Sequence, residues 1–97
     1  MEIIKMLTIS SCHVSLWGGA HFLEAEAACC KSFALTVYDK DEFGWFIYIN
    51  QDELANSRNE IPEDLLRCID LALENGCSML CLDRDGEKLN ALPQYEW

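Results

Sequence analysis

The sequence has few basic residues and no long apolar run. It contains 7 Lys and Arg against 17 Asp and Glu, so its formal net charge is −10 at pH 7. A surface of this sign repels a phosphate backbone, and we expect no direct binding of nucleic acid. No segment approaches the roughly 18 consecutive apolar residues of a membrane-spanning helix, and no secretory signal follows Met1. We therefore expect a cytoplasmic protein that does not bind a membrane.

The paired Cys spacing of a typical zinc site is also missing. The six Cys residues include no C-x₂-C pair. Without an export signal we interpret them as reduced thiols, mostly buried as small hydrophobic side chains. We accordingly expect no metal and no cofactor. Two alternatives stay open, a zinc site formed by His21 with Cys29 or Cys30, and a metal or small-ligand site near Cys12, His13 and His21.

A complete catalytic signature is absent as well. Residues 79–86 (MLCLDRDG) are similar to the strand and D-x-D-G motif of haloacid dehalogenase phosphatases, in which the first Asp is the nucleophile. Eleven residues follow Gly86, too few for the parallel sheet and further carboxylates of that chemistry. An EF-hand loop does not fit either, because Gln94 stands where a bidentate Glu is required. We expect no enzyme and interpret Asp83 and Asp85 as turn formers.

The chain does contain enough apolar material for one core. Hydrophobic residues make up 51% of the 97 residues, with three Trp, three Tyr and four Phe among them. Such a chain can fold without a metal or a disulfide, although its margin of stability is small. The length is close to the commonest size of a single domain, so we expect one domain over 1–97.

The hydrophobic pattern predicts four strands and two helices. Segments rich in β-branched and aromatic residues predict strands over 3–9, 33–38, 44–49 and 77–82. Helical spacing predicts helices over 20–31 and 62–75, the second with Pro62 at its start and Asn75-Gly76 at its end. This order is that of ferredoxin-like domains. We predict an α+β fold, a two-layer α/β sandwich (βαββαβ) with a mainly antiparallel sheet and both helices on one face.

Three further segments are informative. Residues 50–61 are polar and predict a flexible loop or one weak helical turn. In the strand over 44–49, large apolar side chains alternate on both faces, which indicates a strand in the sheet interior or one that meets a partner. In the tail, Leu92, Tyr95 and Trp97 are expected to dock on the domain or on another chain. A homodimer through the aromatic strand or the tail is therefore possible.

Acidic residues between 50 and 75 are the feature best suited to carry function. They comprise Asp52, Glu53, Glu60, Glu63, Asp64, Asp70 and Glu74. On the predicted helix, an apolar stripe faces the core while Glu63, Asp70 and Glu74 lie on the opposite side. Exposed carboxylates can take the place of phosphates against the Lys and Arg of a nucleic-acid enzyme. We predict that this set binds a basic host protein.

Several segments of the chain carry a family resemblance. They lie at 43–48 (FGWFIY), 61–65, 76–77, 82–86 and 92–97. In these segments the chain resembles a small bacterial family of unknown function whose members occur on plasmids, integrated elements and phages. Residues 17–30 depart most from that family. The resemblance carries over no catalytic residue and implies an accessory gene of a mobile element.

Charge, the missing catalytic signature and the resemblance lead to one hypothesis. We predict a non-enzymatic accessory protein of a mobile element or phage that inhibits a host nucleic-acid-processing defence system, by an anti-CRISPR or anti-restriction action. Its partner would be a CRISPR effector or a restriction nuclease. The alternative is a small-ligand or metal-binding regulatory domain with its site near Cys12, His13 and His21.

Overall fold

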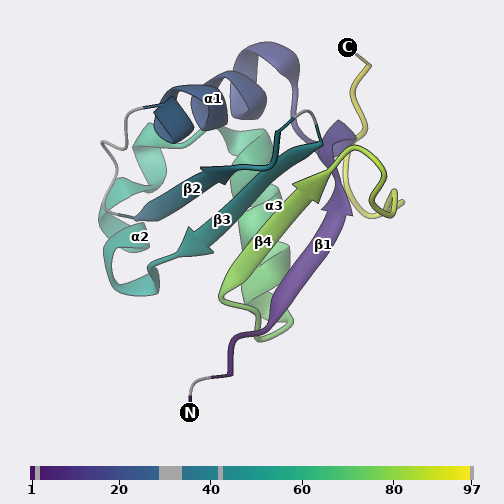
Figure 1. Cartoon of the computed structure of the whole chain (residues 1–97). Helices are drawn as coiled ribbons and strands as arrows, with labels where there is room; N and C mark the ends of the chain where they lie inside the picture. Colours follow the sequence, from purple (N-terminus) through teal and green to yellow (C-terminus); the bar gives the residue numbers. More distant parts are fainter. Residues whose placement is uncertain (2, 29–33, 42, 97) are drawn as a thin grey trace.

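The computed structural model describes residues 1, 3–28, 34–41 and 43–96. Those residues form the strands β1 (Met6–Ser10), β2 (Leu35–Asp39), β3 (Gly44–Ile49) and β4 (Met79–Asp83) and the helices α1 (His21–Ala28), α2 (Gln51–Ser57) and α3 (Glu63–Glu74), as Figure 1 shows. The short helical turns are η1 (Ser11–His13), η2 (Leu16–Ala20) and η3 (Arg58–Glu60). One four-stranded sheet with helices agrees with the predicted α+β class. None of the described helices has the length and apolar character to cross a membrane.

The sheet is mixed, with the strand order β1-β4-β3-β2. Strand β1 runs parallel to β4, whereas β3 is antiparallel to both β4 and β2. This departs from the predicted ferredoxin-like order, in which one strand separates the two parallel strands of each βαβ unit. The return of the chain after α3 explains the difference. The backbone N–H groups of Ser78 and Met79 donate to the Lys5 carbonyl oxygen at 3.1 and 3.2 Å, so β4 enters directly beside β1.

Alternate strand residues turn inward and form the core with α3. Ile47, Leu80 and Leu82 are fully buried, and Leu80 lies opposite Ile47 in the register of β3 and β4. From α3 the buried residues are Asp64, Leu65, Cys68, Ile69 and Ala72, which include most of the predicted apolar stripe. Burying one large aliphatic side chain contributes about 1.5–3 kcal/mol. This packing holds α3 against the sheet.

Helix α3 confirms the helix predicted over 62–75. Pro62 directly precedes its first residue, where a missing N–H costs nothing. At the other end, Gly76 has a φ of 73°, the left-handed conformation that ends many helices. The backbone N–H groups of Gly76 and Cys77 donate to the carbonyl oxygens of Leu73 and Ala72 at 3.0 and 2.9 Å. These bonds satisfy the last turn of the helix.

The polar segment 50–61 is more ordered than the sequence predicts, because it contains α2 and η3. The Asn50 side chain accepts a hydrogen bond from the Asp52 N–H at 3.2 Å and so caps α2. Leu54 is buried and anchors the helix to the core. The other differences are at element ends: β1 starts at Met6, and the predicted helix 20–31 runs to Ala28 within the described residues.

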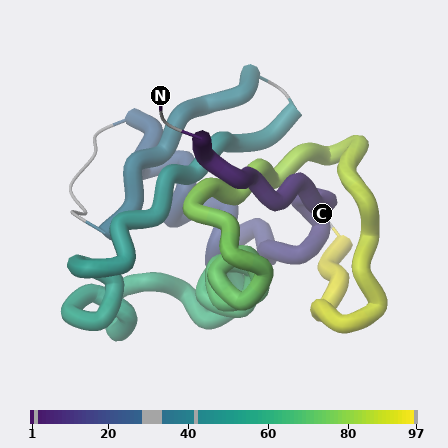
Figure 2. The backbone as a smooth tube through the Cα atoms, turned by 90° about the horizontal axis from the view of Figure 1, so that it is seen from below, coloured from purple at the N-terminus to yellow at the C-terminus, as the bar shows by residue number. Residues whose placement is uncertain are grey.

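One face of the sheet has no described helix over it. In Figure 1 the strands β3 and β4 pass in front of α3, and Figure 2 shows α3 on one side of the strands. We call the side of the sheet turned away from α3 the open face. Its strand residues are Met6, Thr8, Thr36, Tyr38, Phe46, Tyr48, Met79 and Cys81, and the register adds Ser10, Gly44 and Asp83 at the end of the sheet where β1 and β4 finish.

Candidate functional site

Several loops meet at one end of the sheet. Because β1 and β4 are parallel, their carboxyl ends at Ser10 and Asp83 lie side by side. Gly44, the first residue of β3, is opposite Asp83, which brings Asp41 and Phe43 to the same end. Ligand sites of open α/β sheets commonly lie outside the carboxyl ends of strands. This end is therefore the first place to look for a site.

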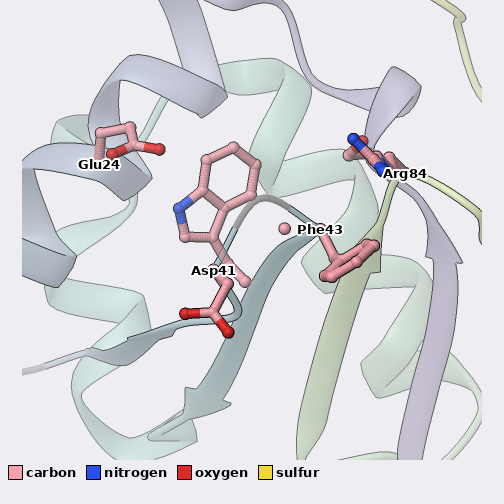
Figure 3. Close-up of a pocket in the computed structure, with 7 residues that line it drawn as sticks. Glu24, Asp41, Phe43 and Arg84 are labelled. Carbon is pink, nitrogen blue, oxygen red and sulfur yellow. The ribbon is translucent and has the colours of Figure 1, made fainter.

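Three adjoining hollows lie at this end, and we call them together the end groove. The first has a volume of about 350 Å³ and is lined by Ser11, Glu24, Asp41, Phe43, Gly44, Trp45 and Arg84, as Figure 3 shows. The second, of about 150 Å³, is lined by Leu16, Trp17, Ala20, His21, Glu24 and Trp45. The third, of about 230 Å³, is lined by Ser10, Ser11, Cys12, Arg84, Lys88 and Tyr95. The first hollow shares Glu24 and Trp45 with the second, and Ser11 and Arg84 with the third, so the three lie next to one another.

Charges of opposite sign occupy different parts of the end groove. In Figure 3, Glu24 and Asp41 lie toward one side of the hollow, and Phe43 and Arg84 toward the other. The Arg84 guanidinium lies 4.7 Å from the centroid of the Phe43 ring, which is a cation–π contact. Within the described part of the chain, neither Glu24 nor Asp41 forms an ion pair. Both carboxylates are exposed and can meet a partner's cation.

The backbone at the start of β3 needs a glycine. Gly44 has a φ of 142°, and a Cβ there would lie 1.7 Å from the Leu82 carbonyl oxygen. Asp41 has a φ of 51°, a left-handed conformation that Asp tolerates better than most residues. The Arg84 N–H donates to the Phe43 carbonyl oxygen at 2.7 Å and joins the turn to the loop after β4. Gly44 therefore allows the close approach that brings Asp41, Phe43 and Arg84 together.

The D-x-D-G motif after β4 forms a turn, as the sequence predicts for Asp83 and Asp85. The Asp83 carboxylate accepts a hydrogen bond from the Asp85 N–H at 2.9 Å, and the Gly86 N–H donates to the Asp83 carbonyl oxygen at 2.9 Å. The Lys40 ammonium forms an ion pair with the same carboxylate. That hydrogen bond lowers the pKa of Asp83 and raises the pKa of Lys40. Asp83 is therefore a charged structural anchor.

Asp64 points inward, so it does not belong to the exposed acidic surface that the sequence predicts. The side chain is 9% exposed. One carboxylate oxygen accepts hydrogen bonds from the Ser15 N–H at 2.6 Å, the Ser15 hydroxyl at 2.9 Å and the Gly19 N–H at 3.0 Å. Burial raises the pKa of Asp64, but these bonds and one from the Leu65 N–H outweigh it and the pKa lies below its usual value. Asp64 thus holds the loop that carries Trp17.

His13 fixes the tail through hydrogen bonds to both of its ring nitrogens. Its Nδ1 lies 2.8 Å from the Pro93 carbonyl oxygen, and its Nε2 accepts a hydrogen bond from the Leu89 N–H at 2.9 Å. These partners place the hydrogen on Nδ1 and engage both ring nitrogens. Among the described residues, no group of three or more His, Cys, Asp and Glu is arranged to hold a metal. The predicted ligands Cys29 and Cys30 lie outside those residues, while the His21 ring lies beside Trp17, with ring centroids 6.3 Å apart and an angle of 45° between the ring planes.

The tail docks on the domain through residues that the sequence singles out. Leu92 packs against the core, and the Tyr95 N–H donates to the Cys12 carbonyl oxygen at 2.8 Å. Tyr95 and Lys88 line the third hollow of the end groove. Trp97, the third predicted docking residue, lies outside the described residues. The tail therefore contributes directly to the end groove.

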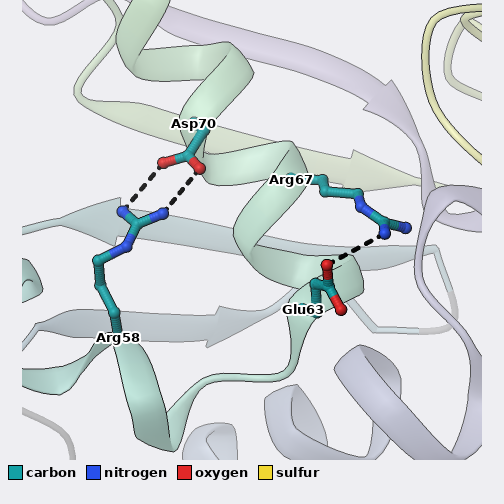
Figure 4. Close-up of polar contacts among 4 residues, drawn as sticks. All are labelled: Arg58, Glu63, Arg67 and Asp70. Atoms are coloured by element: carbon teal, nitrogen blue, oxygen red, sulfur yellow. Dashed lines mark hydrogen bonds and ion pairs between the residues drawn. The ribbon is translucent and has the colours of Figure 1, made fainter.

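The remaining predicted acidic residues are spread over the helices. The Arg58 guanidinium donates two hydrogen bonds to the Asp70 carboxylate at 3.0 and 2.8 Å, and Arg67 donates one to Glu63 at 3.2 Å, as Figure 4 shows. The exposed residues with no ion pair in the described part of the chain are Asp52, Glu53, Glu60 and Glu74. The seven predicted residues therefore do not form one free acidic face.

The end groove itself is missing from the sequence-based prediction. Glu24, Asp41 and Arg84 come from a helix, a turn and a loop that are distant in the sequence, so no spacing relates them. Trp17 is 83% exposed, and the Gly18-Gly19 pair beside it is the one feature of the local sequence that marks this loop. A Cβ at position 19 would lie 2.8 Å from the Val14 side chain. Gly19 therefore lets the loop that carries Trp17 pack closely enough to reach Asp64.

One comparison with known proteins gives a match. The model of a family described as "Family of unknown function (DUF5983) C-terminal domain" matches residues 6–97. No curated protein and no solved structure matches the chain. The matched range contains every residue that lines the end groove and every strand residue of the open face.

Proposed function

The chain belongs to the family of unknown function DUF5983, C-terminal domain, and on that premise we propose a non-enzymatic protein-binding domain whose end groove accepts a cationic side chain. The observation that carries this proposal is the first hollow, of about 350 Å³, in which Glu24 and Asp41 lie with the Trp45 ring. Carboxylates beside an aromatic ring hold Lys and Arg through charge-assisted hydrogen bonds and cation–π contact.

The expected gain is large enough to select a charged side chain. A hydrogen bond to a charged group contributes about 1.5–3 kcal/mol. Replacing a bound Arg by a neutral residue of the same shape would therefore weaken binding by roughly 10-fold to 100-fold. The net charge of −10 adds a long-range attraction for any basic partner.

Trp17 favours a protein as the partner over a small molecule. It is 83% exposed and lines the second hollow beside Leu16, which is 44% exposed. Aromatic side chains that combine large apolar area with few rotatable bonds dominate many protein interfaces. When a partner segment places a cationic side chain between Glu24 and Asp41, the residues next to it in that segment can cover Trp17.

The basic part of the end groove gives the partner segment a direction. Arg84 and Lys88 line the third hollow, whereas Trp17 lines the second. The first hollow shares side chains with both of them. A carboxylate on the same segment would pair with these two cations. The proposed ligand is therefore an extended segment with an apolar residue, a basic residue and an acidic group in that order.

We propose that the partner is a nucleic-acid-processing enzyme of a defence system, such as a CRISPR effector or a restriction nuclease. Such enzymes expose Lys and Arg to hold phosphates, and the exposed Asp52, Glu53, Glu60 and Glu74 would attract the same surface. The setting would be the cytoplasm, with the gene carried by a plasmid, integrated element or phage, as the sequence resemblance implies.

Binding and cleavage assays on a panel of purified basic nucleases test the proposal. We expect at least one nuclease to be bound and inhibited, and the double variant Glu24→Gln/Asp41→Asn to bind it roughly 30-fold more weakly. The matched control is Asp52→Asn/Glu53→Gln, which removes the same charge from α2 and should bind within about 3-fold of the wild type. Equal losses in the two variants would reject the end groove as the site. The end groove would also be rejected if the nuclease is inhibited and neither variant binds it more weakly than the wild type.

A further inference from the structure

The open face is a second surface with a composition unlike the rest of the molecule. Strand register places its side chains in two rows across the sheet: Met6, Met79, Tyr48 and Thr36 in one, and Thr8, Cys81, Phe46 and Tyr38 in the other. Tyr38 is 59%, Met6 44% and Tyr48 39% exposed. Met, Tyr and Phe are enriched in protein interfaces, whereas Asp, Glu and Lys are depleted.

The open face carries no net charge in a strongly acidic protein. None of the residues in its two rows is Asp, Glu, Lys or Arg. At its end toward the end groove, Lys40 forms an ion pair with Asp83 and lies 5.3 Å from the centroid of the Phe46 ring. The carboxylates that give the chain its charge of −10 are concentrated elsewhere, for example on α2 and α3.

We propose that the open face binds the open face of a second copy of this chain, related by a two-fold axis. Most other contacts between two copies would bring carboxylates together, which costs free energy. This face brings no carboxylate of its two rows against the partner, which reduces that repulsion, and it presents the same rows of side chains to its counterpart, as a two-fold interface requires. Two sheets that pack face to face in this way lie roughly 10 Å apart, with their side chains interdigitated.

Charge also decides against other occupants. A basic partner gains nothing from a neutral surface and is attracted to the end groove and to α2. A nucleic acid would be repelled by the net charge and would find Lys40 already paired. A second copy also carries a charge of −10, but contact through this face gains apolar burial and leaves the carboxylates of α3 on the far side of each sheet.

The size of the open face sets the expected strength of the contact. Four strands of five or six residues cover about 20 Å by 17 Å, roughly 340 Å² in projection. A stable interface buries about 800 Å² on each partner. The dimer should therefore be weak and depend on protein concentration, with the exposed Ile3 and Ile4 before β1 available to enlarge the contact.

Analytical ultracentrifugation of the full chain from about 5 μM to about 500 μM tests the proposal, because a weak dimer forms in that range. We expect the wild type to change from monomer to dimer and the double variant Tyr38→Glu/Tyr48→Glu to stay monomeric. The matched control Leu16→Glu/Trp17→Glu places two charges on exposed apolar side chains of the end groove and should dimerise like the wild type. Circular dichroism of each variant checks that the fold is intact.

Salt gives an independent test that also separates this proposal from the proposed function. Raising NaCl from about 50 mM to about 500 mM screens the repulsion between two chains of −10, so the dimer should become tighter by several-fold. Binding of a basic partner in the end groove should become weaker. A wild type that is monomeric at every concentration and salt level, or a Tyr38/Tyr48 variant that still dimerises, would overturn the proposal.

Discussion

The end groove and the open face are built in opposite ways. The end groove draws its side chains from a helix, a turn, two loops and the tail, and it depends on individual residues such as Gly44 and Asp64. The open face needs only the alternation of side chains along four paired strands. The groove is charged and the face is neutral. The comparison teaches that one small domain can present two surfaces that respond to salt and to mutation in different ways.

The largest expected effect comes from Gly44→Ala, which damages both surfaces. The new Cβ would meet the Leu82 carbonyl oxygen at 1.7 Å, and the φ of 142° is unfavourable for any residue with a Cβ. Because β3 pairs with β4 at this point, the sheet itself must shift. We expect a loss of about 4 kcal/mol or more in the free energy of unfolding, measured by urea denaturation.

Gly76→Ala is the control for that variant. Gly76 also has a positive φ, 73°, but a Cβ there would have Lys5 Nζ as its nearest neighbour at 3.7 Å. The cost should be about 1–2 kcal/mol, from backbone conformation alone. If the two variants lose the same stability, the close approach at Gly44 is not what shapes this end of the sheet.

Asp64→Asn should loosen the end groove and leave the open face intact. The neutral amide oxygen is a weaker acceptor for the three hydrogen bonds that one carboxylate oxygen receives from Ser15 and Gly19, and the amide NH2 would face the Leu65 N–H. We expect a loss of about 2–3 kcal/mol at pH 7, a change in the fluorescence of the exposed Trp17, and unchanged self-association. Glu53→Gln, on the surface of α2, should change stability by less than about 0.5 kcal/mol.

The pH dependence of stability checks the role of Asp64 further. Its pKa in the folded protein is lowered, so its contribution is fully present above the unfolded value of about 3.9 and is lost as the pH falls through the folded value. Asp83 has a lowered pKa as well and acts in the same direction. Urea denaturation at several acidic pH values should therefore show that the free energy of unfolding falls less steeply with falling pH in Asp64→Asn than in the wild type. Parallel curves would contradict the account of Asp64.

Arg58→Ala should have only a small effect on stability, and it tests whether a basic partner binds in the end groove or on the helices. Arg58 and Asp70 are each 42% exposed, so their ion pair contributes less than about 1 kcal/mol. The variant frees the Asp70 carboxylate and makes α3 more acidic. Binding of a basic partner in the end groove should change by less than about 3-fold. A much tighter complex would place the partner on α3.

The sequence predicts those parts of the molecule that depend on local pattern. Helix α3 follows from its apolar spacing and from Pro62 and Gly76, and β3 follows from its run of aromatic and β-branched residues. The turn at Asp83 and Asp85 is predicted for the same reason, because short acidic side chains bond to nearby backbone N–H groups.

Features that depend on tertiary structure are not predicted. The position of β4 between β1 and β3 is set by where the chain returns after α3, which no local pattern records. Two misses had a readable signal. Asn50 two residues before Asp52 is a helix cap, and Asp64 lies four residues before Cys68 and eight before Ala72, on the buried stripe of α3. For the end groove the one local signal was the Gly18-Gly19 pair beside Trp17, since the other residues of the groove come from distant segments.

The most direct test of the central claim compares two short peptides that differ only in charge. One contains arginine flanked by an apolar residue and an acidic residue, and the other has neutral citrulline in place of the arginine. Isothermal titration of the full chain should give roughly 10-fold or greater preference for the arginine peptide. That preference should disappear in Glu24→Gln/Asp41→Asn and persist in Asp52→Asn/Glu53→Gln. Equal affinity of the wild type for both peptides would contradict a cation-accepting end groove.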